Sequence, residues 1–252
     1  MKLLLPQNIF AEIFLSAINT VKEIQSEFIP SALLAKKLSN EPGLVALIPT
    51  LDLINHKELF VSPDLGISFD GPISNALIYF KHGDDALDEL VLSGDVSTNE
   101  VLLSKIIFKE LYDLDVSVSL NTSGETTADK NYLVVGSDNF QKNKFVNGIT
   151  LAEEVSELIN APYVNFVLAS ASEETLKEFL DTYKNNLNDS TTIDLTSVIQ
   201  GQSQLAVEFI TTNIQHLIFT FEEQDVEGIN LLLELPYYHG IIKEMIDIKF
   251  VS

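Results

Sequence analysis

The chain contains 252 residues, of which 46% are hydrophobic, and it carries a formal net charge of −22 from 37 acidic and 15 basic residues. Every basic residue is a lysine, and the chain has no cysteine. Nucleic acids and anionic membranes are therefore poor partners, because both require clustered cationic side chains. The lack of cysteine excludes disulfides, thiolate nucleophiles and cysteine-bound metals.

No apolar stretch reaches the roughly 20 residues that cross a bilayer, so no membrane span is expected. The opening "MKLLLPQNIF" has too short an apolar region for a signal peptide, and it is typical of a first strand. We therefore expect a cytoplasmic protein, and a signal peptide removed before this sequence begins stays open as the alternative.

Apolar periodicity predicts strands and helices that alternate along the chain. In chain order these are a strand at 2–5, helices at 10–24 and 31–38, strands at 43–48 and 73–80, a helix of about four turns from the "STNE" step (97–100) to 111, strands at 115–120 and 132–136, a helix at 151–159, a strand at 163–169, and helices at 172–187, 203–212 and 226–235. This alternation, without internal repeats, indicates an α/β fold.

The sequence offers no motif for a metal or an organic cofactor, and we expect neither. None of the four histidines has metal-ligand spacing. The chain also lacks a dinucleotide-binding glycine fingerprint and a G-x-S-x-G nucleophile motif.

Small polar residues at the ends of the predicted strands are the candidate site. In open α/β sheets, ligands bind beyond the carboxyl ends of the strands, where such residues converge. Taken singly, each residue is better explained by a turn or a helix cap. Three of them interrupt apolar runs and would need a buried partner: Ser74, Asn75 and Asn165. The candidate ligand-binding residues are Asn8, Thr50, Ser74, Asn75, Ser97, Thr98, Asn99, Ser137, Asp138 and Asn165.

Several segments together resemble the menaquinone-biosynthesis family of the futalosine pathway, in its chorismate dehydratase branch. "GISFDGPISNALIYFK" (66–81) and "DVSTNEVLLSKIIFKELY" (95–112) are similar to the family's D-G-P-V-x-S-V stretch and its S-R-T-S-V helix start. Further segments that resemble the family are "PSALLAKKLSNEPGLVALIPTLDLI" (30–54), "YLVVGSDNF" (132–140), "GITLAEEVSELINAPYVNFVLAS" (148–170) and "LPYYHGIIKEMIDIKF" (235–250), the last resembling a closing helix.

The resemblance implies a two-lobed fold like that of type 2 periplasmic binding proteins, with mixed sheets, flanking helices and a small-molecule ligand in the cleft between lobes. One lobe would comprise residues 1–81 and 170–252, and the inserted lobe residues 82–169. It also implies a cofactor-free lyase that eliminates water from chorismate or a related anion. Asn8 matches the family asparagine associated with the substrate carboxylate or proton transfer, so the resemblance makes it the candidate catalytic residue. Ser74 and Ser97 match the family's two serines.

The sequence departs from the family at the helix start, where S-R-T-S has become "STNE" and Glu100 places a carboxylate beside the expected anion site. Three hypotheses follow: a lyase, a non-catalytic solute-binding or sensor protein, and a structural relative whose cleft is filled by its own side chains. The lyase is the leading description here, and the oligomeric state is left open.

The "STNE" step also fits a capping box, in which Ser97 accepts a backbone N–H and Glu100 returns a bond to the backbone of Ser97. If this box is closed, the helix start is capped from within. If Glu100 turns away, the N–H groups are free for an anion.

Overall fold

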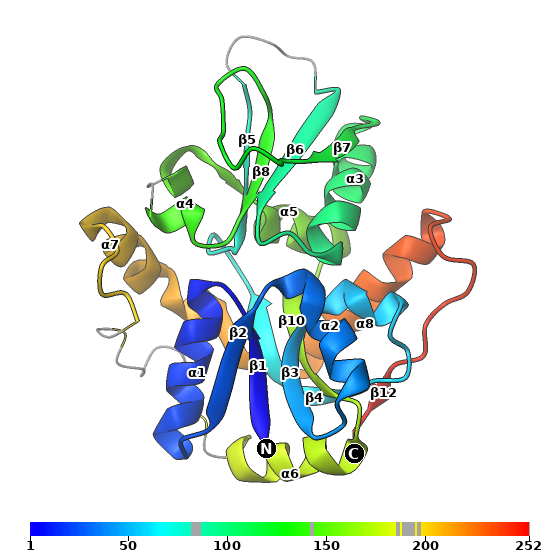
Figure 1. Ribbon diagram of the computed structural model, residues 1–252. Coiled ribbons are helices and arrows are strands. Elements are labelled where there is room, and N and C mark those ends of the chain that lie inside the picture. The colour runs from blue at the N-terminus through cyan, green and yellow to red at the C-terminus, as the bar shows by residue number, and fades with distance from the viewer. Residues whose placement is uncertain (82–86, 142–143, 185–186, 188–194, 196–197, 252) are drawn as a thin grey trace.

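The computed structural model describes residues 1–81, 87–141, 144–184, 187, 195 and 198–251. Two lobes lie one above the other, each with a sheet and flanking helices, and both termini lie at the far end of the first lobe (Figure 1). Among the described residues, no helix is both long and apolar enough to cross a membrane.

The sheet of the first lobe has the strand order β11-β4-β10-β3-β1-β2, with β12 paired to β4. Strand β1 pairs in parallel with β2 and β3, whereas β10 runs antiparallel to β3 and β4. The strands are β1 (Lys2–Pro6), β2 (Gln25–Ile29), β3 (Leu44–Pro49), β4 (Phe60–Phe69), β10 (Tyr163–Ser170), β11 (Leu217–Thr220) and β12 (Lys249–Phe250). The helices joined to it are α1 (Ile9–Val21), α2 (Ser31–Asn40), η1 (Thr50–Ile54), α6 (Glu173–Tyr183), α7 (Gln204–Asn213), η5 (Ile214–His216) and α8 (Glu223–Tyr238).

The sheet of the second lobe has the order β7-β6-β8-β5-β9. Here β6 pairs in parallel with β7 and β8, and β5 is antiparallel to β8. Its elements are β5 (Ala76–Tyr79), β6 (Glu89–Gly94), α3 (Thr98–Tyr112), β7 (Ser117–Leu120), β8 (Tyr132–Val135), α4 (Asp138–Gln141), η2 (Lys144–Asn147), β9 (Ile149–Thr150) and α5 (Leu151–Ile159).

The two sheets share one local arrangement. In each, a first strand (β1 or β6) lies between the next two parallel strands and leads directly into a helix (α1 or α3). Such a strand is the point where the order of connections reverses, and the crevice beyond its carboxyl end is where α/β sheets bind ligands. The carboxyl ends of β1 and β6 both lie at the boundary where the two lobes meet (Figure 1).

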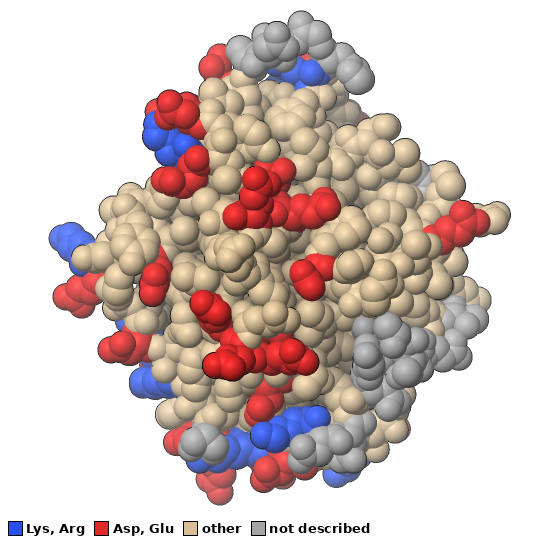
Figure 2. All heavy atoms as spheres, turned by 180° about the vertical axis from the view of Figure 1, so that it is seen from behind, with Lys and Arg blue, Asp and Glu red and all other residues tan. Residues whose placement is uncertain are grey.

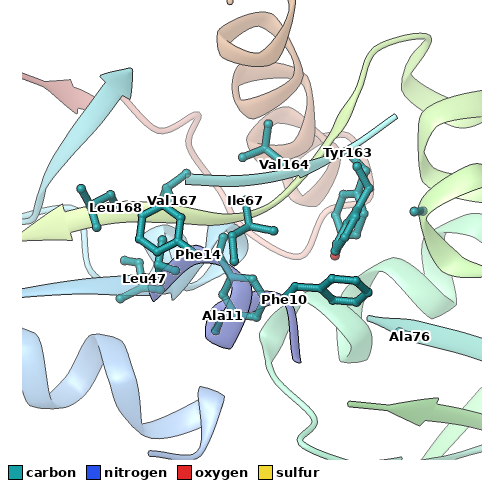
Figure 3. Close-up of a cluster of buried hydrophobic side chains, with 14 of the residues drawn as sticks. Phe10, Ala11, Phe14, Leu47, Ile67, Ala76, Tyr163, Val164, Val167 and Leu168 are labelled. Carbon is teal, nitrogen blue, oxygen red and sulfur yellow. The ribbon is translucent and has the colours of Figure 1, made fainter. Parts of the chain in front are cut away.

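The apolar core is built on β1, β3, β4, β10 and the inner face of α1. Phe10 and Phe14 of α1 are fully buried and point toward Ile67, Val167 and Leu168 of the sheet (Figure 3). The Phe10 ring packs at 5.1 Å from that of Phe69. It also lies 5.7 Å from the ring of Phe140, which belongs to α4 of the second lobe. The apolar packing therefore continues from one lobe into the other.

The α/β class, the mixed sheets and most predicted elements are confirmed. The predicted helix at 151–159 coincides with α5, whereas α1 ends at Val21 rather than residue 24. The last residues of the helix predicted at 172–187 include 185–186, which lie outside the described residues. Strands β2, β4, β6, β9, β11 and β12 were not predicted.

Strand β4 escapes prediction because Pro63 and Gly66 interrupt its apolar pattern. The glycine is needed for close packing, since a Cβ at Gly66 would lie 2.4 Å from the backbone oxygen of Phe166 on β10. The strand also carries register shifts against β10, which break the period of two. Local pattern alone therefore gives little signal for it.

Two strands lie in the opposite sheet from the predicted lobe boundaries. Strand β5, expected in the first lobe, pairs with β8 and β9 of the second sheet. Strand β10, expected in the inserted lobe, is central to the first sheet, where both its neighbours are antiparallel. The chain thus crosses between lobes before β5 and before β10, and residues 82–86 of the predicted lobe lie outside the described residues.

The predicted closing helix at 235–250 is wrong beyond its first turn. Helix α8 ends at Tyr238, and Gly240 follows with a φ of 64° in the left-handed region. The chain then runs without helix to β12 at Lys249–Phe250. A positive φ is readily adopted by glycine, so this residue is a suitable stop for the helix.

Candidate functional site

Polar residues from both lobes meet where the carboxyl ends of the parallel strands face each other. Asn8 follows β1, Thr50 follows β3 and Ser97 follows β6, while Asn165 lies within β10. All four are nearly or fully buried, with exposed fractions of 4% or less. The structure therefore brings these predicted residues to one region, which we call the interlobe site.

The start of α3 is closed by the predicted capping box. The Glu100 carboxylate accepts bonds from the backbone N–H of Ser97 at 2.8 Å and from its hydroxyl at 2.7 Å. The N–H of Asn99 donates to the Ser97 hydroxyl oxygen at 3.2 Å. Burial raises the pKa of Glu100, and the Asp95 carboxylate adds to that rise. The helix end that could attract an anion is thus capped by the chain's own carboxylate.

Asn99 connects the two lobes. Its amide oxygen accepts the N–H of Leu51 at 2.9 Å, and its amide nitrogen donates to the backbone oxygen of Asn165 at 2.7 Å and to the side-chain oxygen at 2.9 Å. The Tyr163 hydroxyl donates to the same Asn165 side-chain oxygen at 3.1 Å. Thr50 donates its hydroxyl to the backbone oxygen of Val164 at 2.6 Å. These buried groups have partners within the chain and need no ligand.

Two carboxylates add to the acidity of this boundary. Asp95, which follows β6, accepts the backbone N–H of Ser31 at 2.8 Å and its hydroxyl at 2.6 Å, joining α2 to the second lobe. Burial raises the pKa of Asp95. Burial also raises the pKa of Asp52, in η1, to about 6, opposed by a hydrogen bond from Thr98. The chain therefore places carboxylates of Asp52, Asp95 and Glu100 at the interlobe site.

Asn8 and Asn75 have buried polar atoms with no partner among the described residues. The Asn8 side-chain oxygen caps α1 by accepting the N–H of Ala11 at 2.9 Å, but its amide nitrogen makes no hydrogen bond. Both side-chain atoms of Asn75 are unpaired, although the residue is fully buried. A buried, unpaired amide group costs about 1–3 kcal/mol, so each group calls for an explanation.

Gly136 lies beside Asp95 and beside the backbone of Asn75 and of Gln7. Its N–H donates to the backbone oxygen of Asn75 at 2.8 Å. A Cβ on Gly136 would lie 3.7 Å from the Asp95 Cβ and 3.8 Å from the backbone oxygen of Gln7, which precedes Asn8. The unpaired amides and the carboxylate therefore belong to one region.

The remaining predicted residues have local structural roles. The Ser74 hydroxyl donates to the backbone oxygen of Ala76 and accepts its N–H. The backbone oxygen of Ser137 accepts the N–H of Phe140, and Asp138 begins α4. These three residues therefore have turn or helix-start roles, which is the interpretation that the sequence favoured for each residue taken alone.

A cavity of about 510 Å³ opens at one side of the interlobe site, between the start of α2 and the β6–α3 connection. We call it the mouth cavity. It is lined by Pro30, Ala32, Leu92, Gly94, Asp95, Val96, Ser97, Thr98, Val101, Leu120 and Asn121. Asp95 is the charged residue among these, and most of the others are apolar.

The site includes acidic residues that sequence reasoning did not select. Asp95 directly follows a strand that was not predicted, so its place at a strand end was hidden. Asp52 lies only four residues after the end of the predicted strand at 43–48, and this position was a usable signal. Within the described residues, no group of three or more acidic or histidine side chains could hold a metal ion.

Acidic side chains are also prominent on the outer surface. In the view from behind, they form several separate patches across the middle of the face, while lysines gather mainly toward its lower edge (Figure 2). With a net charge of −22, the long-range field therefore favours the approach of cationic over anionic solutes.

No family model matches the sequence, and no curated protein matches it. Solved structures do match over nearly the whole chain. Protein AF1704 from Archaeoglobus fulgidus is 13% identical with a TM-score of 0.63, over 96% of this chain and 98% of that one. The ligand-binding component of an ABC-type import system from Staphylococcus aureus, with zinc bound, is 13% identical with a TM-score of 0.60, over 100% and 96%.

The periplasmic aliphatic sulphonate binding protein SsuA from Escherichia coli is 8% identical with a TM-score of 0.61, over 99% of this chain and 90% of that one. At such low identity the likeness shows the fold alone. The chain has a two-lobed fold like that of periplasmic binding proteins, as the resemblance implied. The resemblance to the menaquinone-pathway family stays a prediction.

Proposed function

We propose that this protein binds a small solute between its lobes and acts as a solute-binding or sensor protein. The observation that carries the proposal is the pair of buried asparagines with unpaired amide atoms, Asn8 and Asn75. A solute that pairs with these atoms would remove their desolvation cost. Solute access requires the lobes to separate, because both residues are at most 1% exposed.

The fold supports this proposal. The matching structures from Staphylococcus aureus and Escherichia coli are described as a ligand-binding component and a sulphonate-binding protein. In this chain the carboxyl ends of β1 and β6 lie at the same boundary (Figure 1), which is where a solute would contact both lobes. Binding there would favour the closed arrangement by its extra contacts.

A binding role is favoured over elimination of water from chorismate. Chorismate is a dianion, and here the start of α3 is already capped by Glu100, with Asp95 nearby. The chain has no arginine to offset these charges by a bidentate clamp. The lyase interpretation therefore requires an acidic site to bind an anion.

The third hypothesis, a cleft filled by the chain's own side chains, explains part of the boundary. The hydrogen bonds of Asn99 and the contact between Phe10 and Phe140 join the lobes without a ligand. It does not explain why the buried amide of Asn75 is unpaired, whereas a bound solute would supply its hydrogen-bond partners.

The test is equilibrium dialysis of the protein against a defined mixture of small metabolites that includes chorismate, with mass spectrometry of both chambers. We expect one or a few solutes to be retained by the wild type and released by Asn75→Leu. Loss of chorismate with appearance of its dehydrated product would instead support the lyase. Retention of nothing by the folded wild type would overturn the proposal and favour the structural hypothesis.

A further inference from the structure

The mouth cavity combines apolar walls with one partly buried carboxylate, and this combination defines a class of ligand. Its volume, about 510 Å³, lies within the range of small-molecule pockets. Leu92, Val96 and Val101 line it on the second lobe, and Pro30 and Ala32 line it on the first. A ligand seated there would contact both lobes.

Asp95 is held in place by the first lobe. Its carboxylate oxygens accept bonds from Ser31, one from the N–H and one from the hydroxyl, and the backbone N–H of Gln7 donates to the carboxylate as well. An ionised carboxylate has about four lone-pair sites, so beside these three donors it can accept a further bond from a ligand. The donors from Ser31 and Gln7 are all neutral, and no lysine is among the described residues that line the cavity. The negative charge of Asp95 is therefore available to a cation.

The surroundings disfavour an anion in the same place. Glu100 lies close enough to Asp95 for the two charges to interact, and its carboxylate already occupies the Ser97 N–H at the start of α3. Thr98, which lines the cavity, is bonded to the carboxylate of Asp52. Acidic groups thus lie at the cavity and behind it.

We propose that the mouth cavity binds a small organic cation with an apolar body, its ammonium group on Asp95 and its body against Leu92, Val96 and Val101. This inference rests on the proposed function and names the class of solute. Asn8 and Asn75 do not line the mouth cavity, and their unpaired amides would serve polar groups of a longer ligand that reaches past it. The expected specificity is opposite to that of the sulphonate-binding proteins with the same fold.

Three probes with one apolar body test the inference: hexylammonium, 1-hexanol and hexane-1-sulfonate, each titrated into the full chain at neutral pH by isothermal titration calorimetry. We expect hexylammonium to bind about fivefold or more tightly than 1-hexanol, as one partly buried charge pair provides. We expect the sulfonate to bind more weakly than the alcohol.

Asp95→Asn should lower the affinity for hexylammonium about fivefold and leave that for 1-hexanol unchanged, which also shows that the cavity is intact. Asp181→Asn, an exposed position on α6, is the matched control and should change neither. Equal affinities for the three probes, preference for the sulfonate, or no binding of hexylammonium would overturn the inference. Retention of an anionic solute in the dialysis would likewise overturn it while leaving the proposed function in place.

Discussion

Replacing Asn75 by leucine should stabilise the solute-free protein. Leucine has nearly the shape of asparagine, and it removes two buried polar atoms that have no partner among the described residues. Since a buried, unsatisfied polar group costs about 1–3 kcal/mol, we expect the free energy of unfolding to rise by about 1–3 kcal/mol. For a chain of this size, this corresponds to a rise in Tm of about 2–4 °C per kcal/mol.

The matched control is Asn99→Leu, because the amide of Asn99 is equally buried but makes bonds to Leu51 and Asn165. This variant should lower the free energy of unfolding by about 2–4 kcal/mol, since it leaves their buried groups unpaired. Urea unfolding followed by circular dichroism measures both. If Asn75→Leu destabilises the protein as much as Asn99→Leu does, Asn75 has a structural role and our reasoning about its amide is wrong.

Three further variants test other parts of the structure. Ser97→Ala removes the α3 cap and a donor to the buried Glu100 carboxylate, so it should lower the free energy of unfolding in urea by about 1–2 kcal/mol. This loss should exceed that of Ser172→Ala at the start of α6, and an equal or smaller loss would contradict the capping-box geometry. Burial raises the pKa of Asp52 to about 6, so its contribution favours folding at low pH and is lost as the pH rises from about 4 to 6. Asp52→Asn should therefore flatten that decline and add up to about 3 kcal/mol near pH 7, and unfolding curves of unchanged pH dependence would refute it. Gly66→Ala should lower Tm sharply, because the new Cβ would lie 2.4 Å from a backbone oxygen of β10. Gly43→Ala should leave Tm nearly unchanged, because no atom lies within 4 Å of its new Cβ. Similar Tm values for the two variants would refute the close packing of β4.

The sequence could predict most of the fold where local pattern and structure agree. Helix α5 was predicted to the residue because Thr150 caps it and an apolar face runs to Ile159. Strands with a continuous apolar run, such as β3 and β10, were also found. Strand β2 was missed because its residues are all partly exposed or polar, with no buried face to create a pattern.

The sequence could locate the candidate site, but it could not predict which of the polar atoms there are paired. Position at strand ends identified Asn8 and Thr50, because the carboxyl ends of parallel strands meet at one edge of a sheet. Ser97 was identified by its position at a predicted helix start. Which polar atoms are paired depends on contacts between distant segments, such as Asn99 with Asn165. Sequence pattern carries no signal for such pairings, so it could not separate the paired Asn165 from the unpaired Asn75.

The capping box was the exception, because both partners lie within one turn. The spacing of Ser97 and Glu100 alone determined the bond geometry that the structure contains. The closed box favours the binding hypothesis over the lyase, since it places a buried carboxylate where the lyase would bind an anion.

The central claim, that a solute binds between the lobes, is tested most directly by fixing the lobes together. His239 at the end of α8 and Glu110 on α3 lie across the boundary, with Nε2 and Oε1 3.2 Å apart. Since the chain has no cysteine, His239→Cys with Glu110→Cys can be joined by a short bifunctional thiol reagent without side reactions.

Exchange of the solute retained in dialysis is then followed with an isotope-labelled form. The account predicts that cross-linking slows exchange strongly, while each single-cysteine variant treated with the same reagent exchanges at the wild-type rate. Exchange at an unchanged rate in the cross-linked protein would contradict a site between the lobes.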